Sequence, residues 1–271
     1  MSLLICPVCA SSLERCGNAF KCENSHSFDI SRTGDVYLLR SSKSEHGDSR
    51  EMIVARRDFL NLGFYGFLAD ALAKAADEHL EKKDVVYLDA GCGTGYYTER
   101  VKETLSKERR VEALGIDLSK DAVKMCAKRI KDALFAVASV YSLPIRSESV
   151  DLITNVFSPQ ADEEYARVLK KDGILLYVVP SPRHLYSMKE VLYENPYENE
   201  DKEVEYKGFR LLEKRAVQSV CRLDRAALES LFKMTPYFWT TSREGSARLL
   251  KKEFLDVEFS FYIYVFKKDE I

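Results

Sequence analysis

Four residues near the N-terminus have the types and the spacing of a zinc site. Cys6 and Cys9 form a C-x2-C pair, and after twelve further residues Cys22 and His26 form a C-x3-H pair. Two residues between cysteines make a tight knuckle that points both sulfurs at one ion, and three thiolates with one imidazole close a tetrahedral structural site. Because four protein ligands leave no position for water, a catalytic zinc is not expected. A metal would also explain how a short segment with few large apolar side chains folds.

Cys16 lies between the two pairs and is not expected to bind the metal, because the four other side chains already complete the site. The alternative is that these cysteines are free thiols on a disordered arm. Clustered thiols in a reducing compartment favour metal binding over disulfides. The first residues lack the basic region and the apolar core of a secretory signal, and no segment approaches the roughly 18 apolar residues of a spanning helix. We therefore expect a cytoplasmic protein with no membrane partner.

The segment LDAGCGTGYY, residues 88–97, follows an apolar strand and precedes a helix. Its glycines, Gly91, Gly93 and Gly95, let the backbone turn sharply and approach a ligand with no Cβ in the way. Asp117 closes the next strand, where a carboxylate can accept both hydroxyls of a ribose. This arrangement predicts a nucleoside-containing cofactor, and a dinucleotide is the first alternative.

Two details favour S-adenosylmethionine over a dinucleotide. Asp89 stands two positions before the first glycine, where a carboxylate repels a pyrophosphate and attracts the ammonium group of methionine. The last strand, residues 254–268, alternates strongly and resembles the antiparallel strand that class I methyltransferases add to their sheet. Ser139 follows the third strand and is a candidate for the adenine edge, although the acidic residue usual at this place is absent.

The elements that would position these residues follow from the hydrophobic pattern. From Asp84 onward, apolar strands alternate with amphipathic helices, which implies a mostly parallel sheet covered on both faces. We therefore predict an α/β fold of the class I, Rossmann-like methyltransferase type over residues 84–271, with an antiparallel terminal strand. Residues 1–40 are expected to form a small zinc-binding β module. Residues 41–83 are expected to be a polar linker and a helical segment that breaks at Gly63, and residues 162–171 a helix that ends before Gly173.

Taken in order along the chain, the motifs CPVC, HSFDISRTGDVYLL, GDSREMIVARRDFLNLGFY, DAGCGTGYYT, PRHL and MTPYFW resemble one family closely. That family is the bacterial 23S rRNA (guanine-N1)-methyltransferases. The resemblance runs along nearly the whole chain, and an ordered series of motifs is more specific than any one of them. It implies transfer of a methyl group from S-adenosylmethionine to N1 of a guanine in a 23S rRNA hairpin loop.

The resemblance also implies an assembly and individual residue roles. The assembly is a homodimer whose zinc modules border a basic RNA cleft. Where the family often has a cysteine after the proline that follows the fourth strand, this chain has Gln160. Two of the cofactor contacts that the resemblance implies have an alternative explanation: Tyr65 could be ordinary helix packing, and His184 a residue that starts a helix. The implied residues are Cys6, Cys9, Cys22 and His26 as zinc ligands, and Tyr65, Gly95, Tyr96 and His184 as cofactor contacts.

The charge of the chain gives no support for nucleic-acid binding. The net charge is −2, so any RNA would have to be bound by a local group of basic side chains. A small-molecule methyltransferase with a zinc-stabilised lid is therefore an alternative, and a non-catalytic zinc adaptor is a third hypothesis. No general base can be assigned. Candidates for stacking on a target base are Tyr96, Phe157 and Trp239, and candidates for RNA contact are Lys21, Arg32, Lys43, Arg50, Arg56 and Arg57.

Overall fold

A computed structural model of the chain describes residues 3–40, 48–201 and 203–269. The strands of the main sheet are β4 (Val36–Tyr37), β5 (Asp84–Ala90), β6 (Arg110–Asp117), β7 (Leu134–Val137), β8 (Val150–Val156), β9 (Leu169–Pro180), β10 (Phe209–Asp224) and β11 (Phe254–Lys268). Among the described residues this sheet has eight strands, in the order β10-β11-β9-β8-β5-β6-β7-β4. The strands from β9 to β4 are parallel, and β11 runs antiparallel to both β9 and β10. The predicted mostly parallel sheet with an antiparallel terminal strand is confirmed.

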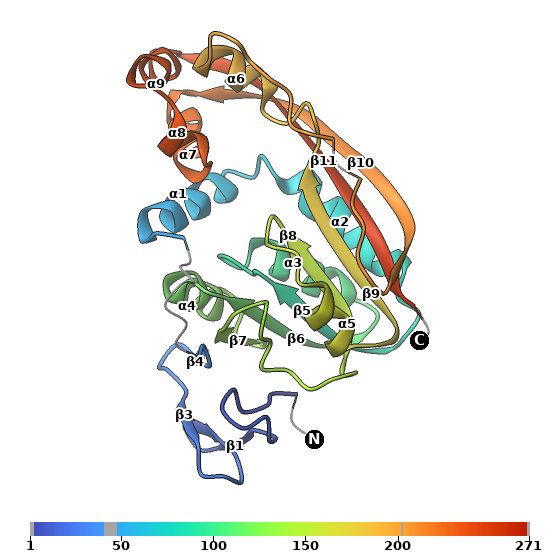
Figure 1. Ribbon diagram of the computed structural model, residues 1–271. Helices are drawn as coiled ribbons and strands as arrows, with labels where there is room; N and C mark the ends of the chain where they lie inside the picture. The colour runs from blue at the N-terminus through green and yellow to red at the C-terminus, as the bar shows by residue number, and fades with distance from the viewer. Residues whose placement is uncertain (1–2, 41–47, 202, 270–271) are drawn as a thin grey trace.

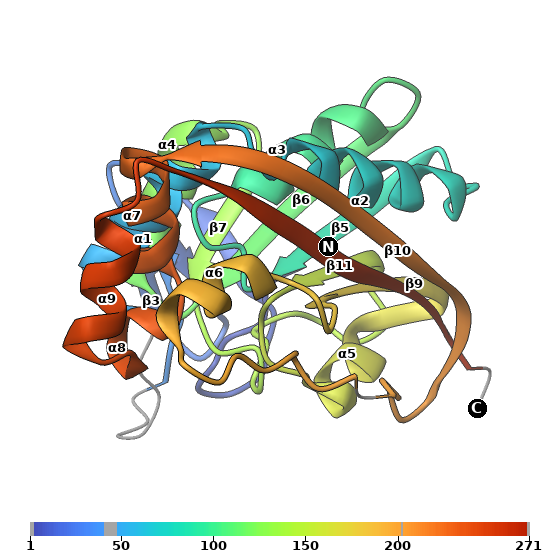
Figure 2. The same ribbon diagram turned by 90° about the horizontal axis from the view of Figure 1, so that it is seen from above.

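Helices cover both faces of the sheet. They are α1 (Arg50–Asn61), α2 (Gly66–Glu78), α3 (Tyr96–Leu105), α4 (Lys120–Arg129), α5 (Asp162–Val168), α6 (Tyr186–Leu192), α7 (Arg225–Met234), α8 (Tyr237–Thr240) and α9 (Arg243–Leu250). α2 and α3 lie together on one face, and α5 lies on the other (Figure 2). α7, α8 and α9 connect β10 to β11, and α6 packs beside them at the same end of this long hairpin (Figure 1).

The central strands are apolar on both faces, which is why they can be covered on both sides. All seven residues of β8 are buried. On one face of the sheet, Phe59, Leu72 and Phe259 belong to a core that α1, α2 and α7 share with the long strands. On the other face, Leu88 and Tyr165 belong to a second core that includes the N-terminal segment. The carboxyl ends of the parallel strands lie at one edge of a sheet whose central strands are covered on both faces.

The structure corrects the predicted end of one helix. α5 ends at Val168 and not at Lys171, and Leu169 begins β9 directly after it. Leu169 pairs in parallel with Val150, and the register shifts between this pair and the next one. The residues after Val168 have helical propensity, but pairing with a neighbouring strand overrides a preference of this size. The sequence pattern predicts this strand only over residues 174–180, and the pairing with β8 extends it back to Leu169.

The N-terminal segment packs on the main sheet and also contributes to it. It has its own antiparallel sheet of β1 (Glu14–Cys16), β2 (Ala19–Lys21) and β3 (Ser27–Asp29). β4 then joins the edge of the main sheet by pairing in parallel with β7. An isolated bridge joins Leu4 to Ile145, and both side chains lie in the second core. The predicted module therefore shares strands and core with the larger domain.

The helical segment has the predicted interruption. α1 ends at Asn61, Gly63 has a φ of 83°, and α2 begins at Gly66. Residues 41–47 of the predicted linker, including Lys43, lie outside the described residues. In the described part of the chain, no helix is both long enough and apolar enough to cross a membrane.

Candidate functional site

The loop between β5 and α3 carries the three glycines that were predicted to face a cofactor. Gly91, Gly93 and Gly95 have φ values of 89°, 52° and 82°, which only glycine adopts without strain. A Cβ on Gly91 would overlap the side chain of Ser158, and a Cβ on Gly95 would lie 2.7 Å from Sγ of Cys126. The loop is therefore held closely between the segment after β8 and helix α4, and larger residues are excluded at both positions.

Of the two side chains predicted to hold a nucleoside, Asp117 is the last residue of β6 and Ser139 comes shortly after β7. The carboxylate of Asp117 accepts hydrogen bonds from the N–H groups of Gly93 at 2.9 Å and Ser119 at 2.8 Å. Burial raises the pKa of Asp117, and these two hydrogen bonds act in the opposite direction. Ser139 is buried, and its Oγ accepts the N–H of Tyr141 at 3.2 Å. Asp117 thus fixes the shape of the glycine loop in addition to standing at the edge where a ribose would lie.

Asp89 lies beneath the glycine loop and not in front of it. The residue is 2% exposed, and its two oxygens accept hydrogen bonds from Oγ1 of Thr98 at 2.5 Å and of Thr154 at 2.9 Å. Burial raises the pKa of Asp89 from 3.8 to about 6, against the effect of the two hydrogen bonds and helped by the negative charge of Asp117. Any attraction of this carboxylate for a ligand ammonium group would therefore act across the loop.

An aromatic cluster brings together two residues that the family resemblance implies at the cofactor. The ring of Tyr65 lies 5.2 Å from that of Phe261 and 6.4 Å from that of His184. The rings of His184 and Phe261 are 4.3 Å apart. Tyr96, the third aromatic residue implied, begins α3 and packs edge-on against Tyr97 at 5.2 Å. Tyr65 and His184, 119 positions apart in the sequence, therefore share one buried cluster.

His184 is a hydrogen-bond donor and not a base. Its Nδ1 accepts the backbone N–H of Ser260 at 3.3 Å, so the proton of the neutral ring is on Nε2. Burial, together with the positive charge of Lys189, lowers the pKa of His184 to about 3. At neutral pH the ring is uncharged, and its Nε2–H is available to an acceptor.

Two buried hydroxyl groups beside the loop have no partner. Oγ1 of Thr94 and the hydroxyl oxygen of Tyr97 are shielded from water and make no hydrogen bond to any described residue. Leaving a buried polar group unpaired costs about 1–3 kcal/mol, so such groups are rare without a ligand or water. With the glycine turn and the carboxylate of Asp117, they would offer polar partners to a nucleoside that bears an amino acid. The residues present fit S-adenosylmethionine.

Several polar residues of this site were not singled out from the sequence. Thr98 and Thr154 hold the carboxylate of Asp89, and Thr154 also hydrogen-bonds the hydroxyl of Tyr87 at 2.8 Å. Asn155 follows Thr154, and both are fully buried. The available signal was the presence of two adjacent polar residues at the carboxyl end of the buried strand β8, because buried polar groups need specific partners.

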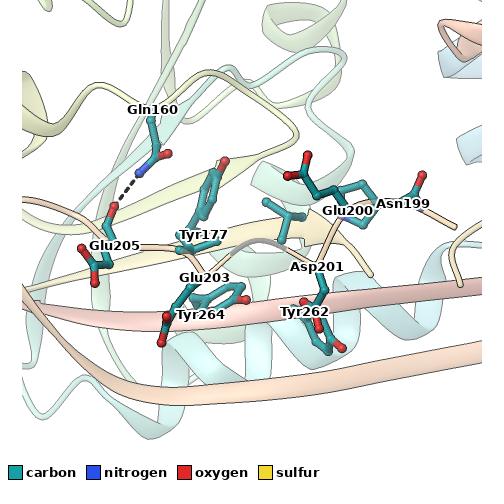
Figure 3. A pocket seen from close by; sticks show the side chains of 12 residues that line it. Gln160, Tyr177, Asn199, Glu200, Asp201, Glu203, Glu205, Tyr262 and Tyr264 are labelled. Atoms are coloured by element: carbon teal, nitrogen blue, oxygen red, sulfur yellow. Dashed lines mark hydrogen bonds between the residues drawn. The ribbon is translucent and has the colours of Figure 1, made fainter. Parts of the chain in front are cut away.

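Gln160, where the chain departs from the family pattern, borders a cavity of about 480 Å³ (Figure 3). Its Nε2 donates a hydrogen bond to the backbone oxygen of Glu205 at 2.9 Å. The ammonium group of Lys214 lies 4.0 Å from the ring centre of Tyr262 and 3.8 Å from a carboxylate oxygen of Asp201. Carboxylates repel phosphate groups, so this cavity is a poor place for an RNA backbone. Its acidic lining residues are Glu200, Asp201, Glu203 and Glu205.

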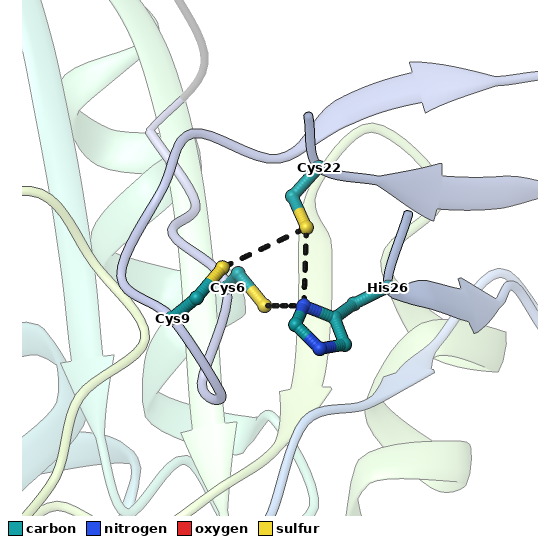
Figure 4. Close-up of side chains that lie close together, drawn as sticks. All are labelled: Cys6, Cys9, Cys22 and His26. Atoms are coloured by element: carbon teal, nitrogen blue, oxygen red, sulfur yellow. Dashed lines mark hydrogen bonds between the residues drawn. The ribbon is translucent and has the colours of Figure 1, made fainter. Parts of the chain in front are cut away.

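The four predicted zinc ligands converge in the structure (Figure 4). Their ligand atoms all lie within 4.8 Å of one another. Nδ1 of His26 is 3.5 Å from Sγ of Cys6 and 3.3 Å from Sγ of Cys22, and the sulfurs of Cys9 and Cys22 are 3.8 Å apart. Cys16 is exposed on β1, outside this group. Three thiols and one imidazole nitrogen at these separations fit a tetrahedral zinc ion.

Comparison with known proteins supports both the zinc cluster and the methyltransferase domain that carries the glycine loop. Residues 4–43 match the family model described as RlmA, N-terminal, and residues 88–177 match the one described as methyltransferase domain. A Bacillus subtilis protein, YxjB, named as a candidate 23S rRNA (guanine-N1)-methyltransferase, is 31% identical over 94% of each chain. The chain belongs to the 23S rRNA (guanine-N1)-methyltransferase family.

A second member of this family is similar over almost the same length. The 23S rRNA (guanine(748)-N(1))-methyltransferase of Streptomyces fradiae is 33% identical over 90% of this chain and 89% of its own. A solved chain from the complex of the Haloferax volcanii Trm112 activator with a candidate methyltransferase aligns with a TM-score of 0.51. It is 19% identical, covering 84% of this chain and all of its own, so it supports the fold alone.

The family and the fold class predicted from the motifs are confirmed. The methyltransferase domain implies S-adenosylmethionine as the cofactor, and the zinc ribbon together with the Cys/His cluster implies a structural zinc ion. The roles of individual residues toward these groups remain predictions.

Proposed function

We propose that this protein transfers the methyl group of S-adenosylmethionine to N1 of a guanine in a hairpin loop of 23S rRNA. The observation that carries the proposal is that one chain combines the zinc cluster and the glycine loop in the order and over the length of relatives named for this reaction. The fit of the residues around the loop to a nucleoside bearing an amino acid is consistent with it.

We assign the cofactor site to the carboxyl edge of the sheet around β5, β6 and β7. Asp117 would accept the ribose hydroxyls, and Ser139 would lie at the adenine edge. Gly91, Gly93 and Gly95 would let the backbone approach the ligand, with Asp89 beneath them providing negative charge. Tyr65, Tyr96 and the Nε2–H of His184 would face the amino-acid part.

The cofactor supplies an electrophilic methyl group on a sulfonium, and the protein must hold N1 of guanine in line with it. N1 carries a proton at neutral pH, which has to leave before or during the attack. His184 does not accept it, because its Nδ1 is engaged by Ser260 and its Nε2 already carries a proton. Positioning two reactants in a near-attack geometry can account for a large part of the rate. We therefore propose that catalysis rests mainly on orientation.

We further propose a cytoplasmic homodimer that binds RNA through local basic side chains. Lys21, Arg32 and Arg50 are exposed and are the strongest candidates. Arg56 and Arg57 are less suited, because each lies in an ion pair with a nearby aspartate, Asp48 and Asp58 respectively. A free basic side chain can exchange its counterions for phosphates, whereas a paired one must first give up its partner.

The test is methylation of a synthetic 23S rRNA hairpin by the purified zinc-loaded protein. Methylation at N1 blocks the pairing edge of guanine, so reverse transcriptase should stop one nucleotide before the modified base. Primer extension on 23S rRNA from a deletion strain should show that stop disappear. A stop that persists without the gene would refute the proposal. Hairpin binding that weakens steeply with salt would also separate it from a small-molecule methyltransferase.

A further inference from the structure

The residue that follows β8, Phe157, has an unusual backbone and an unusual exposure. Its φ is 56°, in the left-handed region, where a bulky non-glycine residue is a genuine outlier. Its side chain is large and apolar, yet the residue is 46% exposed. Conformations of this kind cost about 1–3 kcal/mol and are found mostly where a binding or catalytic site requires them.

The strained conformation is held by the side chain of Asn155. Its Oδ1 accepts the N–H of Ser158 at 3.1 Å, and its Nδ2 donates to the backbone oxygen of Pro159 at 2.8 Å. The same Nδ2 lies 2.9 Å from the hydroxyl of Tyr165, which is itself fully buried. The buried side chain of Asn155 thus binds the backbone of the two residues after Phe157 and holds the turn in this conformation.

This turn lies directly against the cofactor loop. Ser158, the next residue, occupies the space that a side chain on Gly91 would need. The ring of Phe157 is 6.4 Å from that of Tyr97 and 5.3 Å from that of Phe261. Phe261 contacts both Tyr65 and His184. Phe157 is therefore the exposed member of the aromatic cluster that surrounds the cofactor site.

The other two aromatic candidates are placed differently. Tyr96 already has a cation near its ring, because the guanidinium of Arg129 lies 5.7 Å from the ring centre. Trp239 is on α8, in the group of helices at the end of the β10–β11 hairpin, where its ring packs on Phe238 at 5.0 Å (Figure 1). Phe157 alone of the three lies on the turn that abuts the glycine loop.

We propose that Phe157 is the platform on which the target guanine stacks while its N1 faces the methyl group. This inference rests on the proposed function and adds a substrate contact to it. Every base presents a flat face, so an exposed ring at the edge of the cofactor site can hold an unstacked nucleotide. The hydrogen bonds of Asn155 already hold the backbone of the turn before the base arrives, so less conformational freedom is lost on binding.

The experiment compares Phe157→Ala, Phe157→Leu and Phe157→Tyr with the wild-type protein on the rRNA hairpin. The matched control is Phe254→Ala, since Phe254 is similarly exposed, at 52%, but lies at the start of β11 against Arg222. We expect kcat/KM for the hairpin to fall about 5- to 150-fold in the alanine variant. The leucine variant should keep little of the wild-type kcat/KM, and the tyrosine variant should keep most of it. The affinity for S-adenosylmethionine should change less than twofold in all three variants. The control should keep the wild-type rate.

A second readout does not depend on catalysis. The chain has one tryptophan, Trp239, so Phe157→Trp in a Trp239→Phe background places a single fluorophore on the turn. Stacking of a guanine on it should quench its emission when the hairpin binds. Phe157→Gly separates strain from substrate contact, because glycine accepts the backbone conformation freely. This variant should unfold no earlier than Phe157→Ala and should be equally impaired on RNA.

The outcomes distinguish the two proposals. A wild-type protein that methylates no rRNA overturns the proposed function. If the wild-type protein is active, the Phe157 proposal is overturned by alanine or glycine variants that retain the wild-type kcat/KM, by unquenched emission in the hairpin complex, or by equal recovery with leucine and tyrosine.

Discussion

Replacing Asp89 with asparagine should make the cofactor-free protein more stable at neutral pH. The carboxylate is buried and its folded-state pKa is about 6, against 3.8 for an ordinary aspartate. The folded state therefore disfavours the charged form, and the wild-type protein loses stability as the pH rises from about 4 through 6. Asparagine has nearly the same shape, and it can accept from Thr154 and donate to the hydroxyl of Thr98.

The magnitude follows from the size of the pKa shift. About two pH units correspond to about 3 kcal/mol, so the variant should gain roughly that much above pH 7. For a chain of this size the gain corresponds to a rise in Tm of about 5–10 °C. We expect the gain to shrink as the pH falls below 6 and to vanish only below about pH 3, where Asp89 is protonated in both the folded and the unfolded state. Thermal unfolding of the cofactor-free protein between pH 4.5 and 8 measures it.

A matched control is available in a second buried aspartate. Asp151 is 1% exposed, and although burial alone would raise its pKa, hydrogen bonds from Lys170, Lys82 and the N–H of Val86 hold the pKa of Asp151 below its usual value. Asp151→Asn should therefore lower the Tm at neutral pH, opposite to Asp89→Asn. An Asp89→Asn variant that is less stable than wild type at pH 8, or whose gain does not vary with pH, would refute this reasoning.

Three further predictions concern the zinc cluster, the glycine loop and the histidine. Cys9→Ala should abolish the binding of one zinc ion per chain in a colorimetric release assay, whereas Cys16→Ser should retain it; equal retention would exclude Cys9 as a ligand. Gly91→Ala should reduce S-adenosylmethionine affinity at least tenfold by calorimetry because its Cβ collides with Ser158, whereas Gly34→Ala, which is also at positive φ but in open space, should not. The pKa of His184 is about 3, so its imidazole should not titrate between pH 5 and 8 in NMR spectra. The neutral buried ring should contribute stability to the fold that is present above pH 6.5 and is lost as the pH falls. A titration of this ring near pH 6.5 would contradict its assigned burial.

The sequence predicts the order and type of most elements, because apolar periodicity reports burial locally. It indicates a short extended stretch, DVYLL, around Val36 and Tyr37, but it does not predict that this stretch pairs with β7, because the partner lies far along the chain. The end of α5 at Val168 is missed for the same reason: a strand partner decides it, not helical propensity.

For the candidate site, too, the sequence predicts the short-range motifs but not the contacts between residues far apart in the chain. Residue types and spacing indicated the zinc cluster and the glycine loop, since both are short-range patterns. The position of Asp89 beneath the loop was not visible, because it depends on hydroxyl groups of Thr98 and Thr154 that come from two different elements. The left-handed turn at Phe157 was also hidden, since it is imposed by the buried side chain of Asn155.

The pairing of β4 with β7 has a consequence for the order in which the protein is built. The zinc ligands are complete once His26 has been synthesised, so the small antiparallel sheet can take up its metal while translation continues. β4 cannot pair until β7 has been synthesised, and shortly after β7 comes Ser139, the residue proposed for the adenine edge. The zinc-bound sheet can therefore form well before the edge of the main sheet that β4 completes.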